Sequence, residues 1–333
     1  MPLAKPAVLT IRKPPPPSMN RRDFLVRSSL ITAGGCLARP FTFAQTAAPR
    51  PVTAPPAPVT PEFKALRRNA GYFTAQGGTI GWLVNPEALA SVDTQFARTA
   101  PLFLEGLPGR RGRQLDVVIN SHHHGDHTGG NGVLRPATKK LVAHANVPEL
   151  QRSRAAADKK GDVPVVADTT FADTWRQTLG DEVVSAKYLG AAHTKGDIVT
   201  YFEKANVIHM GDLMFNRLYP AIDRAGGGRI KGWITVLETV AKAYPKDAIY
   251  IFGHASAKFG VTGASADLLV FRDYLAGLLD YTQKQINAGE PKERIVAVEN
   301  LPGFPDFHAP VGPANRLPAN LGTAYDELMD RNG

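Results

Sequence analysis

The sequence predicts an α/β fold in which strands and helices alternate along the chain. The chain has 333 residues, 43% of them hydrophobic and 21% charged, which is a globular composition and enough length for one large domain. Short β-prone segments separated by turn residues fill its first half. Segments with apolar residues at helical spacing alternate with further strands and dominate the C-terminal third. Disorder throughout the chain and a collagen-like repeat are excluded.

The first elements are expected to be a meander of strands followed by a helix. Residues 72–74, 79–84 and 88–92 are β-prone, and Gly or Asn-Pro pairs that favour turns separate them. Residues 94–107 carry apolar side chains at roughly helical spacing and predict a helix. Residues 115–119 have the apolar character of a buried strand.

The later elements continue the alternation. Strands are predicted at residues 141–143, 183–189, 198–202, 207–210 and 248–252. Helices are predicted at residues 233–243, 264–287 and 319–329. This order indicates helices packed in layers on sheets.

The net charge of +9 is concentrated at the N-terminus. Residues 1–44 hold seven Lys and Arg residues and one acid, Asp23. The rest of the chain has 32 basic and 29 acidic residues, so its net charge is only +3. No nucleic-acid partner is therefore expected, and the expected partner is a small-molecule substrate.

Residues 1–44 are interpreted as a leader that carries a twin-arginine signal peptide. Arg21 and Arg22 precede a Phe-Leu pair, a weakly apolar run to residue 38 and small residues near Ala44, which is the order of a removable export signal. The apolar run is much shorter than the roughly 20 residues that span a bilayer, so stable membrane insertion is not expected. We expect export by the twin-arginine machinery, which places the protein in the periplasm or outside the cell.

The remaining chain is divided into a linker at residues 45–65, rich in Ala and Pro, and a domain at residues 66–333 that ends in helices. Cys36, the only cysteine, lies in the leader, so the mature protein would have neither disulfides nor thiolate ligands. A lipid anchor on Cys36 and a start at Met19 stay open.

A histidine-rich loop follows the predicted strand at residues 115–119. Residues 121–127 read Ser-His-His-His-Gly-Asp-His, and so many imidazoles beside a carboxylate would be crowded and unsatisfied without a cation. In an extended loop His122 and His124 point to the same side and can bind one ion, while Asp126 and His127 can bind another. Candidates for the missing ligands stand at the ends of predicted strands: His193, Asp212 and His254.

This pattern resembles the metallo-β-lactamase superfamily. Its H-x-H-x-D-H loop is matched by four residues, and its next three ligands correspond in order to three more: His122, His124, Asp126, His127, His193, Asp212 and His254. The resemblance covers residues 71–260 and implies an αββα sandwich of two mixed β-sheets flanked by helices. It also implies a first zinc held by His122, His124 and His193, a second held by Asp126, His127 and His254, and Asp212 as the bridge.

By the same resemblance, the protein is expected to be a binuclear zinc-dependent hydrolase. A hydroxide that bridges the two metals would attack an ester, lactone, lactam or related bond, and Asp126 would be the catalytic residue that orients the water. Histidine-rich ligation without thiolates favours zinc, while manganese or iron stays open. The alternatives are an iron-dependent dioxygenase of the same fold, a phosphodiesterase-type hydrolase, and a metal or ligand binder without catalysis.

Several nearby residues have two possible roles. Asp197 could hydrogen-bond a metal-binding imidazole or cap its own turn. Four residues after Asp212 could line a substrate pocket or lie in the core: Phe215, Asn216, Tyr219 and Trp233. His123 and His209 are expected to support the loop and its neighbours, because neither is in phase with the ligands.

Overall fold

The structure is a computed structural model that describes residues 59–158, 163–310 and 315–330, all within one compact unit, Ala57–Gly333. The predicted twin-arginine signal and most of the predicted linker lie outside the described residues. None of the helices in the described part of the chain combines the length and the hydropathy needed to span a bilayer.

The first sheet has seven strands in sequence order from β1 to β7. Strands β1 to β4 form an antiparallel meander, and β4 to β7 are parallel, so the sheet is mixed. Its strands are β1 (Glu62–Ala65), β2 (Ala70–Thr74), β3 (Ile80–Val84), β4 (Leu89–Val92), β5 (Leu115–Asn120), β6 (Thr138–His144) and β7 (Thr169–Phe171).

The second sheet has six strands in the order β15-β13-β11-β10-β9-β8. Only the pair β11 and β13 is parallel, so this sheet is also mixed. Its strands are β8 (Thr174–Leu179), β9 (Glu182–Tyr188), β10 (Ile198–Phe202), β11 (Val207–His209), β13 (Ile249–Ile251) and β15 (Thr262–Gly263). A separate parallel pair joins β12 (Phe215–Asn216) to β14 (His254–Ala255).

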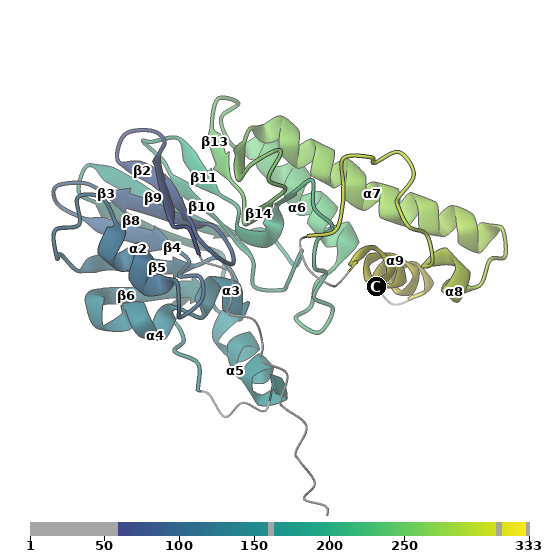
Figure 1. Ribbon diagram of the computed structural model, residues 1–333, viewed down its shortest axis with the longest axis horizontal. Coiled ribbons are helices and arrows are strands. Elements are labelled where there is room, and N and C mark those ends of the chain that lie inside the picture. Colours follow the sequence, from purple (N-terminus) through teal and green to yellow (C-terminus); the bar gives the residue numbers. More distant parts are fainter. Residues whose placement is uncertain (1–58, 159–162, 311–314, 331–333) are drawn as a thin grey trace, which may run out of the picture. The chain divides into compact units, whose positions relative to one another are not determined.

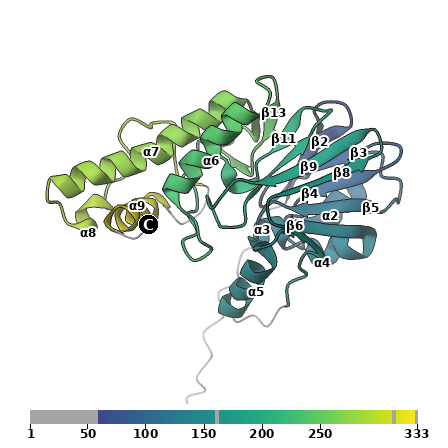
Figure 2. The ribbon, with the colours of Figure 1, turned by 180° about the vertical axis from the view of Figure 1, so that it is seen from behind.

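Helices flank the two sheets in two groups (Figures 1 and 2). The first group consists of α2 (Ala100–Gly106), α3 (Gly125–Thr128), α4 (Asn131–Leu134) and α5 (Val147–Asp158), with a 3-10 turn η1 (Arg135–Ala137). The second group consists of α6 (Ile230–Ala243), α7 (Ser265–Asn287), α8 (Lys292–Ile295) and α9 (Leu317–Met329), with a 3-10 turn η2 (Gly211–Leu213). The last two helices of the second group, α8 and α9, pack on α7 rather than on a sheet.

Three apolar clusters fill the space between these layers. One lies between the sheets and joins Leu83 and Val117 of the first sheet to Ile198 of the second. A second packs Phe103 of α2 on the outer face of the first sheet, and a third packs α6 and α7 on the second sheet around Trp233, with α9 on α7. The layer order is therefore helix, sheet, sheet, helix, which confirms the predicted αββα sandwich of two mixed sheets.

Two predicted segments differ from the structure. The helix expected at residues 94–107 begins only at Ala100, because Gln95 has a left-handed backbone (φ 55°) that no α-helix accepts, and the chain turns there before the helix starts. Residues 62–65, assigned to the linker, form β1 and pair with β2, since Phe63 packs on Phe73 with ring centroids 4.6 Å apart.

Candidate metal centre

The histidine-rich loop connects β5 to the short helix α3. His122 and His123 follow the strand, and His124 is the extended residue that caps α3. The single turn of α3 then brings Asp126 and His127 back toward the same region. The hydroxyl of Thr128 donates to the carbonyl oxygen of His124 (3.0 Å), which holds the loop and helix together.

The seven predicted ligands form two groups, and the first contains His122, His124, His193 and Asp212, whose ligand atoms all lie within 4.8 Å of one another. Nε2 of His193 lies 3.0 Å from Nδ1 of His124 and 3.5 Å from Oδ2 of Asp212. Nε2 of His122 lies 3.8 Å from the same carboxylate oxygen. Three imidazoles from two separate loops therefore face one carboxylate oxygen.

The second group contains Asp126, His127 and His254. Nε2 of His254 lies 3.1 Å from Oδ2 of Asp126 and 3.4 Å from Nε2 of His127. The other oxygen of Asp212, Oδ1, lies 2.9 Å from Nε2 of His127 and 3.3 Å from Nε2 of His254. Asp212 thus turns one oxygen toward each group, and the structure brings together all seven residues that the sequence predicted as ligands.

Glycine permits the close approach of Asp212 to the loop before His254. A Cβ at Gly253 would lie 2.2 Å from Oδ1 of Asp212, a distance that no side chain tolerates. The Gly-His pair at the end of β13 is therefore required for Asp212 and His254 to meet.

The donor set fits divalent metal ions. Nε2 of His122 is buried and has no hydrogen-bond partner among the described residues, while its Nδ1 lies 3.0 Å from the hydroxyl of Ser121. A buried imidazole lone pair without a partner is costly, and a cation placed between the imidazoles would bind it. Nitrogen and carboxylate ligands without thiolates suit zinc and also suit other transition ions.

The protonation states agree with this assignment. Burial and the neighbouring His124 lower the pKa of His193 to about 3, so its imidazole is neutral and can bind a metal. Burial alone would raise the pKa of Asp212, but His127 and His254 hold it well below its ordinary value. Burial alone would lower the pKa of His254, yet Asp212 and Asp126 raise it to about 9. The carboxylates therefore favour positive charge at this position, which a divalent ion supplies.

Two carboxylates that the sequence did not predict contact the imidazoles through the ring nitrogens that do not face the ligand groups. Oδ2 of Asp93 lies 2.7 Å from Nδ1 of His127, and the same side chain accepts from the amide and the hydroxyl of Ser121 at 2.7 Å each. Oδ2 of Asp223 lies 2.9 Å from Nε2 of His124 and 3.3 Å from Nε2 of His123. Such carboxylates orient metal-binding imidazoles and set their tautomers.

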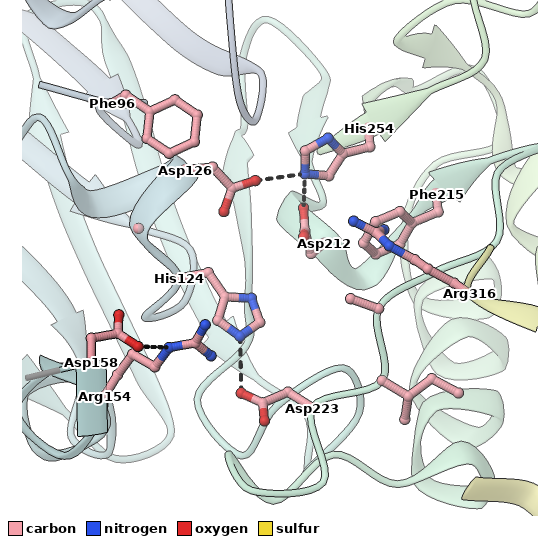
Figure 3. Close-up of a pocket in the computed structure, with 13 residues that line it drawn as sticks. Phe96, His124, Asp126, Arg154, Asp158, Asp212, Phe215, Asp223, His254 and Arg316 are labelled. Atoms are coloured by element: carbon pink, nitrogen blue, oxygen red, sulfur yellow. Dashed lines mark hydrogen bonds and ion pairs between the residues drawn. The ribbon is translucent and has the colours of Figure 1, made fainter. Parts of the chain in front are cut away.

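A cavity of about 550 Å³ opens onto both ligand groups (Figure 3). Asp126, His124, Asp212 and His254 form its metal-binding side, where Figure 3 shows His254 between Asp126 and Asp212. The other walls are a mixture of apolar and charged side chains: Phe96, Phe215, Ile222, Arg154, Asp158 and Arg316. This cavity is large enough for a small-molecule substrate.

The structure distinguishes between the possible roles that the sequence left open for several residues near the ligands. Asp197 accepts from the amide and hydroxyl of Thr194 (2.7 and 2.8 Å) and therefore caps its own turn. Phe215 lines the cavity, whereas Tyr219 and Trp233 belong to the core. His209 supports the chain, since its Nε2 bonds the carbonyl oxygen of Thr79 (2.9 Å).

The comparisons with known proteins agree with this geometry. Residues 81–254 match the family described as the metallo-beta-lactamase superfamily. A metallo-beta-lactamase type 2 from Bacillus cereus is 23% identical over 187 residues, which cover 55% of this chain and 70% of the relative. A hydroxyacylglutathione hydrolase from Methylococcus capsulatus is 35% identical over 129 residues, which cover 38% of this chain and only 43% of the relative.

Among solved structures, a metallo-beta-lactamase from Pontibacter korlensis is similar in fold. It has a TM-score of 0.54 and 18% identity, and the match covers 65% of this chain and 99% of that one. The chain described here belongs to the metallo-β-lactamase superfamily, and its His and Asp groups make it a metallo-hydrolase.

Proposed function

We propose that this protein is a binuclear zinc hydrolase that acts on a small molecule with an ester, lactone, lactam or related bond. The observation that carries the proposal is Asp212, whose two oxygens face two separate ligand groups at the base of one cavity. Two separate groups of nitrogen and carboxylate ligands, each facing its own oxygen of Asp212, suit two ions.

His122, His124 and His193 would hold the first ion, and Asp126, His127 and His254 the second, with Asp212 shared. When bound, a pair of zinc ions lowers the pKa of water toward neutrality and polarises the oxygen of the bond to be cleaved. No protein nucleophile is then needed.

The protein's own contribution would be to orient the attacking water, and Asp126 is placed for this role. Oδ2 of Asp126 is engaged by His254 at 3.1 Å, and its side chain is 28% exposed toward the cavity. His127 and His254 keep the pKa of Asp126 below its ordinary value despite burial, so it is an ionised acceptor at neutral pH. Asp126 can therefore accept a hydrogen bond from the attacking water and fix its direction, which is the catalytic role we assign to it.

The relatives suggest which substrates to test first. They are named as a metallo-beta-lactamase and a hydroxyacylglutathione hydrolase, so a β-lactam and a hydroxyacylglutathione belong in the panel. A lactone and a phosphodiester complete it, because both bonds have an oxygen that a divalent ion can polarise.

We also propose that residues 1–44 direct the protein through the twin-arginine machinery to the periplasm or beyond. The paired Arg21 and Arg22 support this proposal. Fractionation of cells that express the full chain, compared with an Arg21→Lys and Arg22→Lys variant, tests it. Retention of the variant inside the cell is expected, and equal export of both proteins would contradict the proposal.

The test of the enzymatic proposal combines metal content with turnover. Protein purified after expression of the full chain is expected to contain about two zinc ions per chain and to hydrolyse a member of the panel. His193→Ala should lower the zinc content and abolish turnover, whereas His308→Gln, at an exposed position outside both ligand groups, should change neither. One iron per chain with oxygen consumption would refute the hydrolase and favour a dioxygenase.

A further inference from the structure

Glu327 is a buried carboxylate that belongs to neither ligand group. It lies in α9, beyond residues 81–254, the part of the chain that matches the superfamily, and it is only 5% exposed. A buried carboxylate is costly unless hydrogen bonds satisfy its oxygens. The partners of Glu327 therefore indicate its role.

Both oxygens of Glu327 accept backbone amides at the start of α6. The amide of Ile230 donates to Oε2 (2.8 Å), and the amide of Lys231 donates to Oε1 (2.9 Å). The first amides of a helix have no partner within it, and together they form the positive end of the helix dipole. The N-cap residue, Arg229, makes no side-chain hydrogen bond to them. Glu327 therefore caps α6 from another helix.

The start of α6 in turn holds the loop that carries His193. The amide of Arg229 donates to the carbonyl oxygen of Ala192 (2.8 Å), directly before that ligand. A Cβ at Gly232 would lie 2.2 Å from the carbonyl oxygen of Ala191, so the first turn of α6 packs closely on the same loop. The three consecutive amides at the start of α6 thus join this loop to α9.

Residues 221–229 lead into α6 and contact two imidazole residues of the first ligand group. The carbonyl oxygen of Ala221 lies 2.7 Å from Nδ1 of His193, which leaves Nε2 of that ring for a metal ion. Asp223 donates its amide to the carbonyl oxygen of His193 (3.2 Å), and its Oδ2 lies 2.9 Å from Nε2 of His124. The hydrogen bonds that orient two ligands therefore come from a segment whose end is held by the cap from α9.

We propose that Glu327 is a positioning residue that, by capping α6, holds residues 221–231 in the arrangement in which His193 and His124 bind the first metal ion. It acts through the backbone of this segment and touches neither imidazole. The assignment rests on the proposed binuclear function and adds control of the first ion by the C-terminal helix. The hydrogen bonds of this segment run to the first ligand group and not to the second, so the second ion should depend less on Glu327.

A purely structural cap would also stabilise the fold, so the variants must separate metal binding from stability. Glu327→Gln keeps the size of the side chain, but its single acceptor oxygen cannot serve both amides. Glu327→Asp keeps the carboxylate on a side chain shorter by one methylene and is the milder variant. Asp326→Asn is the matched control, because Asp326 is the neighbouring residue of α9 and its side chain, 57% exposed, pairs with Lys292. Phe103→Leu is a second control that lowers stability from α2, on the first sheet.

The first experiment measures amide hydrogen exchange in the metal-free protein. Glu327→Gln is expected to speed exchange at residues 229–231 by about tenfold relative to the amides of β5, because loss of a helix cap opens the first turn locally. Asp326→Asn should leave these rates unchanged. Equal protection of residues 229–231 in Glu327→Gln and in the unmodified protein would overturn the proposal, since the carboxylate would then not hold the segment.

The second experiment measures the affinity of both zinc ions by competition with a chromophoric chelator, together with the free energy of unfolding of the metal-free protein in urea. Glu327→Gln is expected to weaken the binding of one ion by about tenfold and of the other by less than threefold. The weakened ion should be the one that His193→Ala removes. Asp326→Asn and Phe103→Leu should bind both ions as the unmodified protein does.

The outcomes separate the possible roles. Zinc affinities within twofold of the unmodified protein in a folded Glu327→Gln variant would overturn the proposal, and so would an equal loss of affinity in Phe103→Leu. If only Glu327→Asp folds, a loss of about threefold for the first ion supports the proposal and an unchanged affinity overturns it. Fewer than two zinc ions in the unmodified protein would instead refute the proposed binuclear function, so the two failures are distinguishable.

Discussion

Replacing Asp223 with asparagine tests whether a carboxylate outside the ligand groups controls metal binding. Nδ1 of His124 faces the first ligand group, so its Nε2 carries the proton and donates to Oδ2 of Asp223 at 2.9 Å. Oδ1 of Asp223 accepts from the amide of Gly226 at 2.8 Å, which fixes the carboxylate in place. Burial would raise the pKa of Asp223, but its bonds to His123 and His124 hold it below its ordinary value, so it is ionised.

The asparagine keeps the shape of the side chain and loses its charge. Its single acceptor oxygen cannot serve both Gly226 and His124, so one of the two contacts meets an NH₂ group instead. Loss of a carboxylate behind a metal-binding imidazole typically lowers metal affinity by about 10- to 100-fold, which corresponds to roughly 1.4–2.8 kcal/mol. We expect a loss within this range for the ion at His122, His124 and His193.

The assay is competition for zinc with a chromophoric chelator at constant pH. Asp306→Asn is the matched control, because Asp306 is an exposed carboxylate that pairs with Lys258 and belongs to neither ligand group. His123→Asn separates the two imidazoles that Asp223 contacts and should cost less affinity, since it leaves the bond to His124 intact. Zinc affinity of a folded Asp223→Asn protein within twofold of the unmodified protein would show that the carboxylate does not position His124.

Three further perturbations have defined outcomes. Asp93→Asn should lower the free energy of unfolding in urea by about 3–5 kcal/mol, because the buried Asp93 accepts from Ser121 and His127; a loss below 1 kcal/mol would contradict this. Removal of metal with a chelator should lower Tm, and free zinc at 100 times its Kd should restore about 2.7 kcal/mol; an unchanged Tm would show that the ligand groups bind no ion. Burial raises the pKa of Asp197 to about 8, so the folded state retains a proton that the unfolded state releases above about pH 4. Stability should therefore fall as pH rises from about 4 to 8 more steeply than in Asp197→Asn, and parallel urea profiles of the two proteins would refute this.

The residues that the structure gathers into the two candidate ligand groups could be predicted because their signals are local. Four of the seven candidates lie within residues 122–127, and the other three follow strands, where a chain leaves a sheet and its side chains reach a common edge. The alternation of strands and helices likewise follows from short apolar segments at strand or helix period, whereas the resemblance to the superfamily was needed to predict the αββα sandwich of two mixed sheets.

The missed elements have weaker patterns. Helix α5 buries only Val147, Leu150 and Gln151 of its twelve residues, so it has no apolar stripe of helical period. The predicted start of α2 was too early, because the left-handed backbone of Gln95 depends on its side chain, which donates to the carbonyl oxygen of Gly78 (2.7 Å) in another turn. That contact joins residues 17 positions apart, so no local sequence pattern predicts it.

The supporting residues of the site show the same limit more clearly. Asp93 and Asp223 act on imidazoles 34 and 99 residues away, and Arg316 reaches the cavity from a segment beyond residues 81–254. Each becomes recognisable only when folding brings it to its partner. The heptapeptide that predicts the metal chemistry therefore does not predict the remaining walls of the cavity, because residues such as Arg316 come from distant parts of the chain.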